Sequence, residues 1–207
     1  MSMNSLLLIS EDGLDSSSIL VDISSSVSDM VIWVASEPPD VISKVIDAYD
    51  LKGRIHVLSL IQSRKYKSVN VNNLSEIGIL LSKISEGMED FVVLMTAIPE
   101  LLLIHGLERT YVFLMNVIGK TTNQGRKFIG GITKDAQNKR DEIMISRLFS
   151  IVLRYRKWLE GEKWVRNLII ETPIGDLDKD VVELYLRENR IVIPKNVKDA
   201  IVHELMD

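Results

Sequence analysis

The chain has 207 residues, a formal net charge of −4 and no cysteine. The length predicts one domain of ordinary to large size with a core of its own, and the lack of cysteine excludes disulfides, thiolate metal ligands and cysteine nucleophiles. Only three histidines occur, and they lie far apart, so we expect no metal site and assign no cofactor.

Neither a membrane span nor a secretory signal is expected. No run of about 18 apolar residues appears in the sequence. The apolar stretch within residues 1–10 has no basic residues before it and no small-residue cleavage site after it. We therefore predict a cytoplasmic protein without membrane contact. The negative net charge gives it no general attraction to nucleic acid.

In the first part of the chain, short apolar runs alternate with stretches at helical spacing. Leu6–Ile9 reads as a strand that is buried on both faces. A serine-rich stretch then leads into a helix through Ile19–Ile23, for which Asp15 or a nearby serine is the predicted cap. Met30–Ala35 is the second predicted strand, and a helix follows from Pro38-Pro39.

The same alternation continues through the middle of the chain. Ile55–Leu60 is the third predicted strand, and the polar segment Gln62–Asn73 is predicted to be a loop. A helix through Leu74–Ile84 is expected to stop at Gly87. Phe91–Met95 is the fourth strand.

Beyond the fourth strand, His105-Gly106 marks a predicted helix end, and a long helix is expected over Glu108–Gln124. Lys127–Ile132 is the fifth strand. The Gly130-Gly131 pair inside it predicts a close backbone approach by packed neighbours. A further helix is expected over Asp141–Phe149.

The pattern changes after residue 150. Two strand-like runs, Ile151–Trp158 and Lys163–Thr172, are joined by Glu160-Gly161 and predict a hairpin. In the tail we predict one helix over Asp178–Arg187 and another after Pro194, with a turn at residues 187–190 between them.

Strand–helix alternation followed by a hairpin predicts a three-layer α/β domain. We expect a mainly parallel sheet with helices on both faces and an antiparallel hairpin edge over residues 1–172, and a helical C-terminal extension over residues 173–207. In such folds ligands bind at the carboxyl ends of the strands, which is where site residues are sought.

Three stretches resemble the RecA/KaiC-like family of P-loop ATPases, which is common in archaea. Val31–Leu60 resembles the family's second strand, acidic pair, helix and third strand. Phe91–Leu114 resembles its Walker B strand with the helices behind it, and Ile151–Ile170 its closing hairpin. The resemblance covers residues 4–171 and implies a RecA-like fold, with assembly of domains side by side.

The phosphate loop of this family is degenerate here. A working loop, G-x-x-x-x-G-K-[ST], wraps phosphates with bare backbone N–H groups and neutralises them with a lysine. The corresponding window, residues 10–17, reads SEDGLDSS. Ser10 and Asp15 replace the two motif glycines, while Gly13 lies between them. Ser16 replaces the lysine, and only Ser17 keeps its residue type, at the Mg²⁺-binding hydroxyl position.

Acidic residues also fill this window, namely Glu11, Asp12 and Asp15. Like charges a few ångströms apart cost on the order of 1 kcal/mol each even in water-like surroundings. Tight ATP binding in the standard pose is therefore not expected.

The Walker B position is degenerate as well. Where the family has an aspartate that orders Mg²⁺, this chain has Met95 and Thr96. A thioether does not suit a hard cation, and Thr96 can at most hydrogen-bond a water.

Glu37 matches one member of the acidic pair that activates water in the family. We favour a plainer role for Glu37, as an acid stabilised at a helix N-terminus, because catalysis also needs charge stabilisation.

Two basic clusters raise a second hypothesis. Lys134, Lys139 and Arg140 follow the fifth strand, in a region where recombinase relatives touch DNA. Arg154 and Arg156 project together from the hairpin. Nearby are more cations and two tryptophans that can stack bases, namely Lys157, Lys163, Arg166, Trp158 and Trp164. The alternative is a solvated edge strand whose charges prevent aggregation.

Three functions fit these observations. We favour a catalytically inactive, RecA/KaiC-like scaffold that works by binding protein partners or copies of itself. A nucleic-acid-binding accessory protein, resembling a recombinase paralogue, is the alternative. A nucleotide or small-anion sensor with an altered pose is the third.

Overall fold

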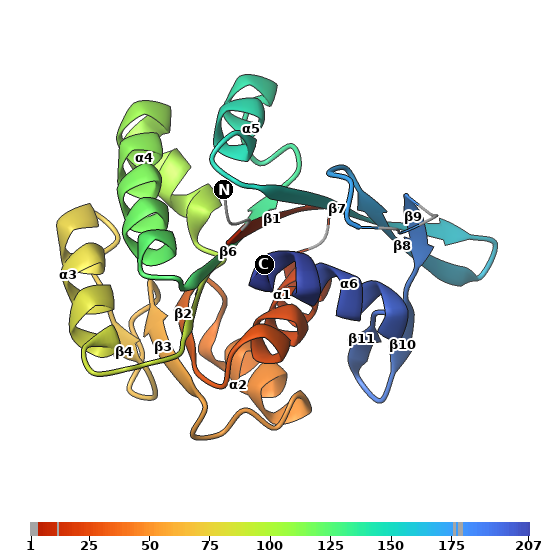
Figure 1. Cartoon of the computed structure of the whole chain (residues 1–207), viewed down its shortest axis with the longest axis horizontal. Coiled ribbons are helices and arrows are strands. Elements are labelled where there is room, and N and C mark those ends of the chain that lie inside the picture. The colour runs from red at the N-terminus through yellow and green to blue at the C-terminus, as the bar shows by residue number, and fades with distance from the viewer. Residues whose placement is uncertain (1–3, 12, 176, 178–179) are drawn as a thin grey trace.

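A nine-stranded sheet forms the centre of the computed structural model, which describes residues 4–11, 13–175, 177 and 180–207 (Figure 1). Its strand order is β4-β3-β2-β5-β6-β1-β7-β8-β9. The strands from β4 to β7 pair in parallel, whereas β8 pairs antiparallel with both β7 and β9. The bounds are β1 Ser5–Ser10, β2 Val31–Ala35, β3 Ile55–Ser59, β4 Lys67–Ser68, β5 Val92–Met95, β6 Lys127–Thr133, β7 Ile151–Glu160, β8 Lys163–Ile170 and β9 Val181–Glu183.

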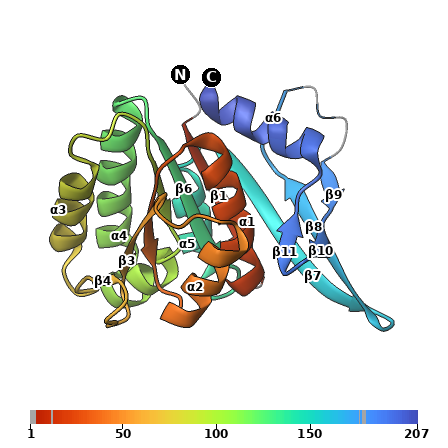
Figure 2. The same ribbon diagram turned by 90° about the horizontal axis from the view of Figure 1, so that it is seen from below.

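Helices cover both faces of this sheet, which gives the predicted three layers (Figures 1 and 2). On one face lie α1 Gly13–Val27, α2 Pro39–Ala48 and α6 Lys195–Met206. On the other lie α3 Leu74–Ser85, α4 Ile98–Asn123 and α5 Lys139–Ser146. The fold class predicted from the sequence is confirmed.

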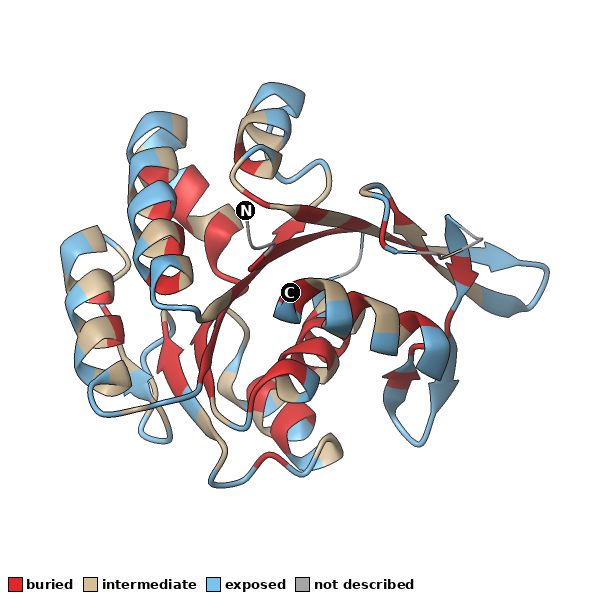
Figure 3. Ribbon diagram, viewed as in Figure 1, coloured by how far each residue is buried: buried red, intermediate tan, exposed pale blue. Residues whose placement is uncertain are grey.

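The two faces have separate hydrophobic cores, and β1 contributes to both. Leu6 and Leu8 pack in the cluster beneath α1, α2 and α6, whereas Leu7 and Ile9 pack in the cluster beneath α3, α4 and α5. Figure 3 shows the buried residues where the helices face the sheet. Because successive side chains of a strand point to opposite faces, a strand with a core on each side needs an unbroken apolar run.

Several predicted boundaries move in the structure. Helix α1 begins at Gly13, so Asp15 lies inside its first turn and does not cap it. The predicted loop 62–73 contains the two-residue strand β4. Helix α5 begins at Lys139, because the Asn138 side chain accepts a hydrogen bond from the Asp141 backbone N–H at 2.9 Å.

The tail differs most from its prediction. The predicted helix over residues 178–187 is wrong: residues 178 and 179 lie outside the described residues, and the rest forms β9 and β10 Tyr185–Arg187. Strand β10 pairs with β11 Arg190–Val192 around Glu188 and Asn189, both at positive φ, as a tight hairpin turn requires. The turn at residues 187–190 and the helix after Pro194, which is α6, are confirmed.

The tail joins the core beneath α1. Ile191, Ile193 and Ile201 are buried in the same cluster as β1. Lys198 Nζ lies 3.1 Å from Asp22 Oδ1 on α1. Strand β11 and helix α6 therefore pack on the same face of the sheet as α1.

Helix α4 is long and apolar enough to cross a membrane by length and composition. Its backbone is not helical at Gly106 (φ 73°, ψ 172°), which agrees with the helix end predicted there. Leu101, Leu114 and Ile118 of this helix are buried against the sheet. The apolar residues on that side of α4 therefore belong to the core beneath α3, α4 and α5.

The two glycines in β6 allow close packing, as predicted. A Cβ at Gly130 would lie 2.8 Å from the Phe149 ring, and one at Gly131 would lie 2.7 Å from Leu20 Cδ1. Real Cβ atoms do not approach other atoms so closely, so each glycine makes room for a neighbour from a different layer.

Candidate functional site

The residues predicted to replace a phosphate loop lie where β1 runs into α1, at the carboxyl ends of the parallel strands. Ser10 ends β1 and is buried, Gly13 begins α1, and Ser16 and Ser17 lie in the first turn. Asp12 lies outside the described residues. The turns after β2 and β5 bring Glu37 and Thr96 to the same place, as expected for parallel strands.

Asp15 is enclosed by groups from the β7–β8 hairpin. Its Oδ2 accepts a hydrogen bond from the Tyr155 hydroxyl at 2.5 Å and from Arg166 Nε at 3.1 Å. Lys157 Nζ also lies 3.1 Å from the same oxygen. The side chains of Asp15, Lys157 and Arg166 are all less than a fifth exposed. Lys157 and Arg166 therefore both supply positive charge to this carboxylate at the start of α1.

Glu37 lies on the other side of the helix start and is held by hydroxyl groups. Thr96 Oγ1 donates to Glu37 Oε2 at 2.7 Å, and the Trp33 indole N–H donates to Thr96 Oγ1 at 2.9 Å. Ser17 Oγ hydrogen-bonds Glu37 Oε1 and also lies 3.0 Å from the Gly13 carbonyl. Glu37 precedes α2 as predicted, but its carboxyl group is buried in this network rather than placed at the helix end. Thr96, expected to hydrogen-bond at most a water, bonds Trp33 and Glu37 instead.

Burial raises the pKa of the Glu37 carboxyl above its usual 4.5, because burial penalises the charged form. The hydrogen bonds from Ser17 and Thr96 lower the pKa, and the nearby charge of Glu100 raises it. The network accommodates a proton on Glu37: Oε1–H can donate to Ser17 Oγ, whose own proton then goes to the Gly13 carbonyl.

A cavity of about 300 Å³ opens beside these groups. It is lined by Gly13, Leu14, Ser16, Ser36, Glu37, Thr96, Pro99, Glu100, Gly131, Ile132 and Thr133. Within the described part of the chain, this lining contains no lysine, arginine or histidine. Glu100 Oε2 is buried without a hydrogen-bond partner. The cavity thus offers acids and hydroxyls where a polyphosphate needs cations.

Met95 does not reach this cavity. Its side chain is fully buried in the core beneath α3 and α4, whereas the neighbouring Thr96 points into the site. Among the residues that the structure describes, no group of three or more histidine or acidic side chains could hold a metal ion.

The candidate nucleic-acid contacts are divided between the turn after β6, helix α5 and strand β7, and some of them are paired with acids. Lys134 Nζ lies 2.7 Å from Glu11 Oε1. Arg154 contacts Glu142 at 3.1 Å and Glu171 at 2.7 Å. Lys139 and Arg140, predicted in a loop, lie in the first turn of α5 and are exposed, and Arg156 is exposed on β7.

A comparison with known protein structures identifies the fold. No family model and no curated protein sequence matches the chain. A crystal structure of a KaiC-like protein from the hyperthermophilic archaeon Pyrococcus horikoshii matches with a TM-score of 0.68 at 12% identity, covering 92% of this chain and 89% of that chain. The chain has a RecA/KaiC-like fold. The resemblance seen in the sequence is confirmed at that level, and at this identity the likeness establishes the fold alone.

Proposed function

We propose that this protein is a RecA/KaiC-like scaffold that does not hydrolyse ATP and that acts in the cytoplasm by binding protein partners or copies of itself. The observation that carries the proposal is the network on Glu37. Ser17 and Thr96 stand at the two positions that hold Mg²⁺ in working relatives, and both hydrogen-bond the Glu37 carboxyl. A group held in this way and biased towards its protonated form is a poor base for activating water.

The distribution of charge supports the same proposal. Hydrolysis of a triphosphate depends on cations that stabilise the transferred group. Here Lys157 and Arg166 approach the start of α1, but both are paired with Asp15. The polar side chains that line the adjacent cavity are carboxyl and hydroxyl groups. A scaffold that keeps the RecA/KaiC-like fold, but no cations available to a phosphate, still has the surfaces that assembly needs.

The direct test measures binding of ATP and ADP with Mg²⁺ to the purified protein by calorimetry, together with phosphate release. We expect no saturable binding at physiological nucleotide concentrations and no turnover. Mg²⁺-dependent turnover that Glu37→Gln abolishes would contradict the proposal.

A restored variant makes this test sharper. Asp15→Gly with Ser16→Lys returns the second glycine and the lysine to the loop and releases Arg166. We expect this variant to gain nucleotide binding that the natural protein lacks, because the backbone start of α1 is kept. The matched control is Ser26→Lys, which adds the same charge at an exposed position near the other end of α1. Equal binding by all three proteins would contradict the premise.

Nucleic-acid binding remains the second candidate, supported by the exposed Lys139, Arg140 and Arg156. Binding of this kind should weaken steeply with salt and on replacement of Lys139 and Arg140 by alanine. No binding to single- or double-stranded DNA near physiological salt would remove this candidate.

A further inference from the structure

One edge of the sheet carries positive charge without acids. Residues 51–75 include five lysines and arginines but no aspartate or glutamate, whereas the whole chain has more acids than cations. This run contains β3, β4 and the loop between them, at the opposite end of the sheet from β8 and β9 (Figures 1 and 2). Charge of one sign is therefore concentrated at this edge, and the negative net charge of the chain conceals it.

The five cations form two groups. Lys52 and Arg54, at the amino end of β3, each pair with an acid of a neighbouring segment. Arg64, Lys65 and Lys67, beyond the carboxyl end of β3, are exposed. None of these three forms an ion pair with an acid in the part of the chain that the structure describes. Their positive charge is available to a ligand.

The segment that carries them, residues 62–68, is the basic loop, and its neighbours anchor it. Its last residues pair with β3 as strand β4. The Ser63 backbone N–H donates to Ser68 Oγ at 3.1 Å. The Tyr66 hydroxyl lies 2.8 Å from Ser43 Oγ on α2. Cations on an anchored loop lose less conformational entropy on binding than cations on a free one.

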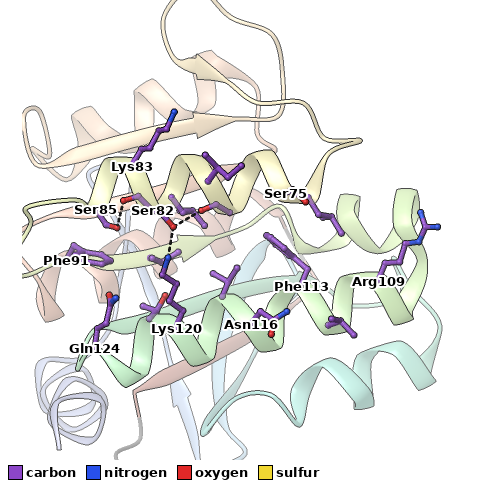
Figure 4. Close-up of a pocket in the computed structure, with 18 of the residues that line it drawn as sticks. Ser75, Ser82, Lys83, Ser85, Phe91, Arg109, Phe113, Asn116, Lys120 and Gln124 are labelled. Atoms are coloured by element: carbon purple, nitrogen blue, oxygen red, sulfur yellow. Dashed lines mark hydrogen bonds between the residues drawn. The ribbon is translucent and has the colours of Figure 1, made fainter.

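The basic loop lacks the apolar anchors on which protein interfaces are centred. Its one large ring, Tyr66, is half-buried and lies beneath Lys65, whose Nζ is 5.7 Å from the ring centroid. Ile61, 41% exposed, adjoins the loop. By contrast, the groove of about 880 Å³ between α3 and α4 has Ile79 and Val112 on its walls, 54% and 50% exposed (Figure 4). Nucleic-acid interfaces are more polar and much more positively charged than protein interfaces, and the basic loop fits that class of partner.

We infer that the basic loop binds the phosphate backbone of nucleic acid. Arg64, Lys65 and Lys67 each bring a positive charge to a phosphate, and the exposed Gln62 amide can donate to a phosphate or sugar oxygen. The Tyr66 ring, covered by Lys65, does not stack on bases. Binding should therefore depend little on base sequence, and a duplex should bind at least as tightly as a single strand.

This surface differs from the one that Lys139, Arg140 and Arg156 would form. The basic loop lies at the β4 end of the sheet, whereas α5 follows β6 and Arg156 lies on β7, nearer the other end. The ligand class is that of the second candidate function, but the surface is new. The inference goes beyond the proposed scaffold and does not depend on the absence of ATP hydrolysis.

Fluorescence anisotropy with a labelled DNA duplex and the matching single strand tests the inference. Three phosphate contacts predict a slope of about −2.7 for the logarithm of the duplex association constant against the logarithm of salt concentration. Affinity should then rise about fortyfold as salt falls from about 200 to 50 mM. At physiological salt we expect a dissociation constant of about 10⁻⁴ M, at the weak end of non-specific binding.

The decisive variant removes the charge of the loop. Replacing Arg64, Lys65 and Lys67 together by glutamine should weaken duplex binding at low salt at least tenfold and bring the salt slope close to zero. Gln62→Lys adds a cation to the same loop and should steepen the slope by about 0.9. This second variant tests the surface independently if the first one does not fold, and melting temperatures show which variants are folded.

The matched control removes the same charge elsewhere. Replacing Lys139, Arg140 and Arg156 together by glutamine should change duplex affinity less than threefold. Equal weakening by the two triple variants would show that net charge rather than the basic loop sets the affinity, and would overturn the inference.

Three further results would also overturn it. They are an unchanged affinity in the folded loop variant, no DNA binding by the natural protein at low salt, and tighter binding to vesicles rich in anionic lipid than to DNA. None of them bears on ATP turnover, and turnover would contradict the proposed function without affecting this surface.

Discussion

Two acids flank the start of α1, and the protein stabilises them in different ways. Asp15 is met by two cations and a phenol from the β7–β8 hairpin. Glu37 is met by hydroxyl groups from α1 and from the turn after β5, and burial raises the pKa of its carboxyl. A counter-charge compensates the first acid, and a bound proton is the favoured compensation for the second.

Under the function proposed above, this difference accounts for a RecA/KaiC-like fold that persists without nucleotide hydrolysis. In a working site, cations and metal-binding oxygens at this position are available to the phosphates. Here the cations serve Asp15 and the oxygens serve Glu37, so the residues stabilise one another. Each side of α1 can be perturbed separately, and the expected effects differ in size and in pH dependence.

The largest effect is expected when the charged cluster loses its centre. Asp15→Ala removes this carboxylate from the largely buried Lys157 and Arg166 and should lower the free energy of unfolding by about 3 kcal/mol, because both cations lose this counter-charge. Urea denaturation at neutral pH measures the loss. Asp29→Ala is the control: it breaks a pair with Arg54 in which Asp29 is 95% exposed, and it should change stability by less than about 0.5 kcal/mol. Equal losses would show that Asp15 is not a charge centre.

A somewhat smaller loss is expected on the hydroxyl side. Thr96→Val keeps the shape of the side chain but leaves the buried indole N–H of Trp33 without its acceptor and removes one hydrogen bond to Glu37. Leaving a buried donor unpaired costs about 1–3 kcal/mol. The same urea titration measures it, and Thr96→Ser, which keeps the hydroxyl, should recover most of the loss. A Thr96→Val protein as stable as the natural one would contradict the network.

The sequence predicts where this site lies but not which side chains form its hydrogen bonds and ion pairs. The strand order placed Ser17, Glu37 and Thr96 together, since parallel strands end at one edge. Nothing in the apolar run Met30–Ala35 marks Trp33 as a site residue, although a buried tryptophan normally needs a partner for its N–H. Tyr155 lies 140 residues from Asp15 in the chain, and no local pattern reveals such a contact. The same distance explains why the sequence groups Lys157 and Arg166 with the other cations of the hairpin rather than with Asp15.

The tail shows a second limit of the sequence. Val182 and Leu184 are buried while Val181, Glu183 and Tyr185 are exposed, which is the two-residue period of a strand. With five apolar residues among residues 181–186, a helical patch can be drawn just as easily. The choice depends on pairing with β8, which lies outside the segment.

A third perturbation distinguishes the two acids by pH. The folded protein holds the proton on Glu37 above pH 4.5, where an unfolded chain has released it. Stability therefore falls as pH rises from 4.5 towards the folded pKa, with a slope of at most about 1.4 kcal/mol per pH unit. Glu37→Gln removes this loss, so the variant should gain on the natural protein as pH rises. Denaturation midpoints across pH 4–8 measure the difference, to which Asp22, also with a pKa raised by burial, contributes equally in both proteins. Parallel curves would contradict a buried, protonated Glu37.

The smallest effect is expected from the neighbour of Glu37. The charge of Glu100 raises the pKa of Glu37 by like-charge repulsion, so Glu100→Gln should lower that pKa and shorten the pH range over which stability is lost. The change in unfolding free energy should stay below about 0.5 kcal/mol, because Glu100 is the least of the causes acting on Glu37. A double-mutant cycle tests whether Glu100→Gln acts through Glu37. In a Glu37→Gln background there is no carboxyl left to shift, so Glu100→Gln should lose its effect on the Glu37 part of the pH profile. If the effect persists in that background, Glu100 acts through another group, and Glu37 owes its raised pKa to burial alone.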